Sequence, residues 1–129
     1  MNDYKKKKVM KMEHLEAIIQ SEDAEHYDEK YIVVQVKEED KVRHVLVSFP
    51  MDYHSEIARA YQRKLDEKAK AVAVRGGGII TVDKKEKKVR TYGMSGSYGG
   101  PDISLVGKIL AKAFPDFSID AKVTAYVRG

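Results

Sequence analysis

The chain has 129 residues, of which 24 are Lys or Arg and 20 are Asp or Glu, and its formal net charge is +4. This length suits one domain with its own hydrophobic core, and the lack of cysteine excludes disulfides, thiolate nucleophiles and cysteine-ligated zinc. No apolar run approaches the roughly 20 residues of a membrane span, and none of signal-peptide type follows the N-terminal lysines, so a cytoplasmic protein without a membrane partner is expected.

The N-terminal part of the chain changes character before the first clear strand. Residues 1–11 carry a lysine block without hydrophobic periodicity, which predicts a basic, flexible tail ahead of a single domain over residues 12–129. Residues 12–19 fit a short strand or a helical turn. The acidic segment 21–29 is typical of a loop.

A hairpin and a helix are predicted next. Residues 31–37 are rich in β-branched side chains and residues 42–49 alternate in hydrophobicity, so a polar turn is expected to join two strands. Pro50 ends the second strand, and a helix is predicted over residues 52–69 with Asp52 as its N-cap. The apolar stripe of this helix consists of Ile57, Ala60, Tyr61, Leu65 and Ala69.

The second half of the chain predicts four more strands and a second helix. The strands are expected at residues 71–75, 79–82, 88–92 and 117–127. The helix is expected to begin at Pro101 and Asp102 and to end before Pro115. The order β-β-α-β-β-β-α-β predicts an α/β (α+β) fold, in which a single mixed, largely antiparallel sheet is flanked by two helices.

His54 is the first candidate for chemistry, because it lies where the first helix is expected to begin. The positive end of a helix macrodipole favours the neutral imidazole and attracts anions. Neutral imidazole is the form that acts as a general base or as a nucleophile toward phosphorus. The alternative is a surface histidine without a chemical role, and position alone does not separate the two.

A loop of glycines and small hydroxyl residues, 92–102, is the second candidate. Its backbone N–H groups can form an anion-binding nest, the following helix adds free N–H groups, and Ser95 and Ser97 add hydroxyls. A flexible connection is the alternative. The loop is not a Walker A motif, because no Gly-Lys-Ser/Thr closes it, and its glycine spacing is not that of a dinucleotide fingerprint.

The other glycines and histidines indicate structure rather than a metal site. Gly76–Gly78 lie between two predicted strands, which favours a close backbone approach or a bulge. Seven of the nine glycines fall between residues 76 and 100, so one end of the sheet is expected to be built for the close approach of a ligand or loop. His14, His26 and His44 have no metal-ligand spacing, and neither a metal nor another cofactor is expected.

Together these segments resemble the 14-kilodalton phosphohistidine phosphatase, or Janus, family over roughly residues 30–120. The motifs that carry the resemblance are Lys30-Tyr31-Ile32-Val33, Tyr53-His54 before a helix, Gly76-Gly77-Gly78, Tyr92-Gly93-x-Ser95-x-x-Tyr98-Gly99 and Phe114-Pro115-Asp116-Phe117. From His54 to Phe117 the family pattern needs no gap. A Tyr-His pair alone is weakly specific, whereas this set at this spacing is fairly specific.

The resemblance implies a metal-independent phosphatase that removes phosphate from phosphohistidine in proteins, with phospholysine as a further substrate class. His54 matches the family's catalytic histidine, described as a general base or a transient phosphate acceptor. Lys30 matches its phosphate-binding lysine, and Tyr53 matches the tyrosine beside the histidine. The family's phosphate-binding loop matches Met94, Ser95, Gly96 and Ser97.

Two arginines of the family pattern are absent from this chain. Their positions fall on Leu46 and Ile79, and Arg43 or Arg75 is expected to substitute for them in binding phosphate or substrate. Their loss bears on substrate identity more than on the fold.

Three functions are therefore carried forward. The first is a cofactor-free phosphohistidine phosphatase whose partners are phosphate and phosphohistidine-containing proteins. The second is a phospho-ligand binding module of the same fold without turnover, motivated by the missing arginines. The third is a basic nucleic-acid-binding domain, which only the pI near 9.1 and the lysine-rich runs 5–8 and 84–88 motivate, since no nucleic-acid-binding motif accompanies them.

Overall fold

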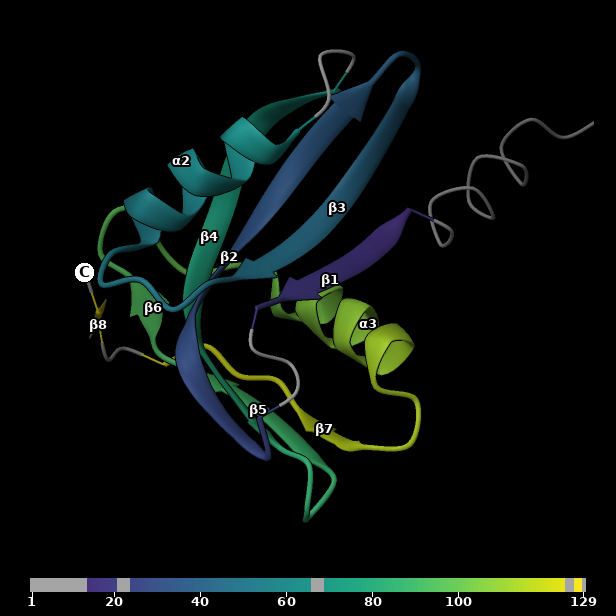
Figure 1. Ribbon diagram of the computed structural model, residues 1–129, viewed down its shortest axis with the longest axis vertical. Coiled ribbons are helices and arrows are strands. Elements are labelled where there is room, and N and C mark those ends of the chain that lie inside the picture. The colour runs from purple at the N-terminus through teal and green to yellow at the C-terminus, as the bar shows by residue number, and fades with distance from the viewer. Residues whose placement is uncertain (1–13, 21–23, 66–68, 125–126, 129) are drawn as a thin grey trace, which may run out of the picture.

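The computed structural model describes residues 14–20, 24–65, 69–124 and 127–128 (Figure 1). The predicted basic tail, residues 1–11, lies outside these ranges. None of the helices within them is long and apolar enough to span a membrane.

The described residues form strands and helices in an order close to the predicted one. They are β1 (Leu15–Ile19), β2 (His26–Glu38), β3 (Lys41–Ser48), α2 (His54–Lys64), β4 (Ala69–Asp83), β5 (Lys88–Tyr92), β6 (Met94–Ser95), α3 (Ile103–Ala113), β7 (Ser118–Asp120) and β8 (Val127–Arg128). Six strands make the main sheet in the order β1-β3-β2-β4-β5-β7, and β6 and β8 pair separately. The sheet is mixed, because β1 runs parallel to β3 and β7 parallel to β5, while the three inner pairings are antiparallel.

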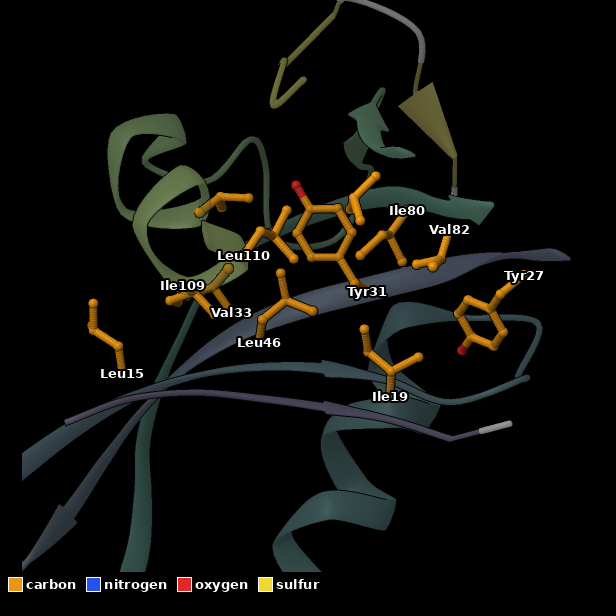
Figure 2. Close-up of a cluster of buried hydrophobic side chains, with 12 residues drawn as sticks. Leu15, Ile19, Tyr27, Tyr31, Val33, Leu46, Ile80, Val82, Ile109 and Leu110 are labelled. Atoms are coloured by element: carbon orange, nitrogen blue, oxygen red, sulfur yellow. The ribbon is translucent and has the colours of Figure 1, made fainter. Parts of the chain in front are cut away.

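The helix α3 covers one face of this sheet. Figure 2 shows Ile109 and Leu110 of α3 directed toward Val33 of β2 and Leu46 of β3, all of which are buried. This cluster has more buried residues than the cluster on the other face, and burial of side chains of this size contributes about 1.5–3 kcal/mol each.

The helix α2 covers the opposite face. Alternate residues of a strand point to opposite faces, and β2 is apolar on both. Its residues Ile32 and Val34 pack with Ile57 and Tyr61 of α2. The predicted α/β fold with two flanking helices is confirmed, and α2 is the layer that carries His54.

The triple glycine is part of one long strand, whereas the sequence predicts separate strands at residues 71–75 and 79–82. Strand β4 continues through the glycines because a bulge absorbs the irregularity: Ile32 pairs with Gly77 but Val34 pairs with Val74. Arg75 and Gly76 therefore face a single residue of β2. An extra residue of this kind bends the strand without ending it.

The ends of several other elements also differ from the prediction. Residues 26–29 belong to β2 rather than to a loop, because they pair with residues 80–83 of β4. The first helix ends at Lys64 and not at Ala69, which is buried at the start of β4 opposite Glu38. Of the predicted strand over 117–127, the described residues form β7 and the start of β8, and residues 121–124 belong to no strand.

Other expectations are confirmed by the described residues. Residues 15–19 take the strand alternative and not the helical turn. The polar segment 84–87 forms the turn between β4 and β5, held by a bond from the backbone N–H of Glu86 to the Asp83 carboxylate at 3.0 Å.

Two buried tyrosines make the stability of this fold sensitive to alkaline pH. Burial raises the pKa of Tyr27 to about 12 and the pKa of Tyr31 to about 12. The neutral hydroxyls stabilise the fold fully below about pH 10, where unfolded tyrosine ionises, and this stabilisation is lost between about pH 10 and 12. We expect the free energy of unfolding in urea to fall across that window.

The Tyr27→Phe variant provides the control for this effect. It removes the 2.7 Å hydrogen bond between the Tyr27 hydroxyl and Ser48 Oγ, so it is expected to cost about 1 kcal/mol at pH 8. Its free energy of unfolding should then fall less steeply above pH 10 than that of the wild type. Equal slopes for the two proteins would contradict the assignment to Tyr27.

Candidate functional site

The candidate site lies where the first turn of α2 meets the glycines of β4. His54 is the first residue of α2, and Tyr53 is its N-cap in an extended conformation. The backbone N–H of Tyr53 donates to Glu56 Oε1 at 3.0 Å, one half of a capping box. The prediction of Asp52 as N-cap is wrong, because the helix begins one residue later than that cap requires.

The imidazole of His54 is fully buried, so His54 is not a surface histidine. Its Nε2 lies 3.0 Å from the carbonyl oxygen of Gly78. A carbonyl only accepts hydrogen bonds, so Nε2 carries the hydrogen and donates it. In the neutral ring the lone pair then belongs to Nδ1, and this nitrogen is the one able to take up a proton or to attack phosphorus.

The glycines of β4 are required by how closely other atoms approach them. A Cβ on Gly77 would lie 2.5 Å from the carbonyl oxygen of Tyr31 and 2.9 Å from Cδ2 of His54. Gly76 has a φ of +126°, and a Cβ there would lie 2.7 Å from the backbone of Gly100. The predicted close backbone approach and bulge are both confirmed.

The glycine and serine loop lies against the same three glycines. The N–H of Gly77 donates to the carbonyl oxygen of Gly99 at 3.0 Å. Within the loop, the N–H of Gly99 donates to the carbonyl oxygen of Ser95 at 2.9 Å. The two segments singled out in the sequence are therefore brought together, with the triple glycine between His54 and the loop.

Part of the loop's hydrogen-bonding capacity is used inside the loop. Ser95 is buried, and its Oγ accepts from the N–H groups of Ser97 at 3.1 Å and Tyr98 at 3.0 Å. An anion-binding nest over the whole loop would require these two N–H groups to point at the ligand. They donate to Ser95 Oγ instead. Gly96 and Ser97 are exposed at the tip of the loop, and the Ser95 hydroxyl keeps its single hydrogen to donate.

Replacing Ser95 with Ala is expected to loosen this loop. Two N–H groups would lose their acceptor, at a cost of about 1–3 kcal/mol that falls on local rather than global opening. Faster hydrogen exchange at the amides of Ser97 and Tyr98 measures it. The matched control is Ser97→Ala, whose exposed side chain should leave exchange nearly unchanged; equal exchange in both variants would contradict the role of Ser95.

The N-terminus of α3 is closed by its own cap. Asp102, at the helix start that the sequence predicts, is the N-cap, and its Oδ1 accepts from the N–H groups of Ser104 at 3.0 Å and Leu105 at 3.3 Å. The expectation that α3 offers free N–H groups to an anion is therefore wrong for these two. A carboxylate already occupies the position that an anion would take.

Lys30 lies on the same side of the sheet as His54. It is two residues from Ile32, which packs toward α2, and it pairs with Ile79 next to Gly78. The carbonyl oxygen of Lys30 accepts from Ser48 Oγ at 2.6 Å, which fixes the strand at this position. Lys30 is partly exposed, and its side chain supplies positive charge beside the glycines of β4.

The two arginines expected to substitute in the family pattern lie in different places. Arg75 is exposed in the bulge, next to Gly76. Arg43 instead pairs with Glu16 at 2.9 Å and Glu38 at 3.6 Å. In β3, Arg43 is four residues away from the residue that pairs with Ile32. At about 3.3 Å per residue these two positions are about 13 Å apart, so the structure does not bring Arg43 to His54.

The two positions that hold arginine in the family pattern carry core residues here. Leu46 is fully buried in the cluster under α3, on the face opposite His54. Ile79 is 2% exposed and lies directly across from Lys30. Neither position adds charge to the site.

The remaining candidates border the site. Tyr53 is 58% exposed beside the buried His54. Met94 is half-buried in β6, and its Cε would lie 3.5 Å from a Cβ on Gly100. Within the described residues no group of three or more His, Cys, Asp or Glu side chains is placed to hold a metal ion.

Sequence reasoning missed the contribution of the C-terminal segment. Thr124 Oγ1 accepts from the N–H of Gly93 at 2.8 Å, and β8 pairs with Met94 and Ser95. A Cβ on Gly100 would lie 2.7 Å from Cγ1 of Val123. These residues hold the loop from outside, and the only signal for them was the strand-like alternation after Phe117.

A family model matches most of the chain. The Janus/Ocnus family (Ocnus) model covers residues 15–118, which includes His54, the triple glycine and the loop. The chain therefore belongs to the Janus/Ocnus family. No curated protein matches it.

Proposed function

We propose that this member of the Janus/Ocnus family is a cytoplasmic protein phosphatase that hydrolyses the P–N bond of phosphohistidine, with phospholysine as a second substrate class. The observation that carries the proposal is the orientation of His54. Its Nε2 is bound to the carbonyl oxygen of Gly78, so the neutral ring has its basic nitrogen at Nδ1. Burial in contact with the glycines holds the ring in that orientation.

Three groups around His54 suit a phosphoryl group. The first turn of α2 lies beside the ring, and the helix dipole adds positive charge at this end of the helix. Lys30 adds a cation on the same face of the sheet. The exposed part of the loop, at Gly96 and Ser97, adds further polar groups beside the triple glycine. Fixed donors of this kind stabilise charge on phosphoryl oxygens without reorganising.

The proposed reaction can take two forms. In the first, Nδ1 takes a proton from water while the water oxygen bonds to phosphorus, the P–N bond breaks, and the substrate imidazole leaves after gaining a proton. In the second, Nδ1 itself bonds to phosphorus as the P–N bond breaks, and water then cleaves the new bond. Both forms release phosphate and unmodified histidine.

The test is phosphate release from a phosphohistidine peptide in the presence of EDTA. Release is expected for this peptide and not for the same peptide carrying phosphoserine, because alkoxide is a much poorer leaving group than protonated imidazole. Release that requires added metal, or no release, would contradict the proposal.

A second candidate is a phospho-ligand binding module, favoured by the apolar, buried residues Leu46 and Ile79 at the family's arginine positions. It predicts binding of the phosphohistidine peptide without release of phosphate. Calorimetry with the same peptide distinguishes this outcome from a complete absence of binding.

A further inference from the structure

One stretch of β4 borders the candidate site and, among the residues that the structure describes, is paired on one side only. On one side, β4 pairs with β2 over its whole length. On the other side, β5 pairs with Ile79–Asp83, and the carbonyl oxygen of Gly99 accepts from the N–H of Gly77. Within the described part of the chain, no strand lies on the second side of residues 69–75 (Figure 1). Such an edge presents backbone N–H and C=O groups to any extended chain beside it.

A groove of about 300 Å³ runs between this edge and α2. Its walls include Ala73 and Val74 of β4, Ser55 and Arg59 of α2, and Tyr98 of the loop. Its lining along α2 runs from Ser55, the residue after His54, to Gln62, about two helical turns. The groove and the edge are thus continuous with the candidate site.

We propose that this edge docks an extended segment of the phosphorylated substrate protein, which adds to β4 as a further strand and delivers its phosphohistidine to His54. The inference rests on the proposed phosphatase function. Peptides that add to a sheet edge gain affinity from backbone hydrogen bonds and specificity from pockets for alternate side chains. Here the groove beside Val74 would take one such side chain.

Charge and distance define that segment further. Arg59 and Arg75 are both exposed beside the groove and the edge, which favours an acidic side chain in the docked segment. From Ala73 to Gly77 the strand advances about 13 Å, or four residues at about 3.3 Å each. The acidic residue is therefore expected three to four positions from the phosphohistidine.

The first test compares two substrates: free phosphohistidine, and a decapeptide that carries a phosphohistidine and the acidic residue three to four positions from it. In Arg59→Glu we expect kcat/KM for the peptide to fall about ten-fold, the loss of one charge-assisted contact, while the value for free phosphohistidine stays unchanged. The matched control is Arg63→Glu, which makes the same charge change one turn further along α2, outside the groove. It should leave both values within about two-fold of wild type.

The second test is a scan of single N-methylations along the peptide. A docked strand bonds through alternate residues, so kcat/KM should fall at every second position and not between them. If kcat/KM did not alternate along the scan and Arg59→Glu had the same kcat/KM as wild type, the docking proposal would be overturned while the proposed function would stand. Failure to hydrolyse either substrate would overturn the proposed function, and the docking with it.

A second copy of this chain is the competing occupant of the edge. If two copies paired here, the protein would be a dimer in solution, and the amides of residues 69–75 would be protected from hydrogen exchange without any peptide. We expect a monomer whose edge becomes protected only when peptide is added. Protection in a peptide-free dimer would overturn the proposal.

Discussion

Replacing His54 with Gln is expected to abolish phosphate release from phosphohistidine and to leave the fold nearly intact. The amide nitrogen of Gln reaches the position of Nε2, so it can still donate to the carbonyl oxygen of Gly78. It offers nothing at the position of Nδ1, which in this account takes the proton or the phosphoryl group. Loss of a general base lowers kcat by about 10²–10⁴, and steady-state kinetics together with thermal unfolding measure both effects.

The matched variant is His54→Asn, which has the opposite geometry. Its amide lies near the position of Nδ1 and is too short to reach the carbonyl of Gly78, which is left buried without its present donor. That variant should therefore be inactive and also less stable, by about 1–3 kcal/mol. Activity near wild type in His54→Gln would contradict the assignment of Nδ1, whatever the stability of the two proteins.

Gly77→Ala is expected to have the second largest effect, on stability and on activity together. The new Cβ would lie 2.5 Å from a carbonyl oxygen of the neighbouring strand, where no side-chain rotation relieves the clash. Overpacking of this kind costs about 1–3 kcal/mol. The Cβ also lies 2.9 Å from Cδ2 of His54, so the ring should be displaced and kcat lowered.

The control for this variant is Gly107→Ala, in the middle of α3. Apart from the adjacent residues and the backbone of the helix itself, no atom lies within 4 Å of a Cβ built there. Alanine in a helix is favoured over glycine by about 0.5–1 kcal/mol, so this variant should be slightly more stable and fully active. Equal stability of Gly77→Ala and wild type in urea unfolding would contradict the close approach of β4 to the Tyr31 carbonyl of β2.

The parts of the fold that the sequence predicts well are those with a strong local pattern. The strands at residues 31–37 and 42–49 are rich in β-branched or alternating residues, and Asp102 is a strong N-cap placed directly after proline. Each signal arises within a few neighbouring residues. Local propensity is therefore sufficient to place these elements.

The parts that it misplaces depend on partners far along the chain. Residues 26–29 read as a polar loop and become a strand only because β4 pairs with them. Ala69 continues the helical stripe, but opposite Glu38 it is buried as a strand residue. Glycines usually interrupt a strand, and in β4 a bulge opposite Val33 accommodates them instead.

The candidate site divides in the same way. The residue types of His54 and the glycines are visible in the sequence, and so is their clustering. The burial of His54 and its bond to Gly78 are not, because a backbone carbonyl has the same identity at every position. Ser95 and the N-terminus of α3 look like donors to an anion, yet the Ser95 hydroxyl and the Asp102 carboxylate both accept from backbone N–H groups of their own segment.

The central claim is that His54 presents an unprotonated Nδ1 to the phosphoryl group while Nε2–H is held by Gly78. The most direct measurement is ¹⁵N NMR of histidine-labelled protein, assigned with His54→Gln, during a titration with inorganic phosphate at a pH where the ring is neutral. We expect a protonated Nε2 throughout and a change in the shift of Nδ1 as phosphate binds. A proton on Nδ1 in the free protein, or phosphate binding that leaves both nitrogens of His54 unchanged, would contradict the account.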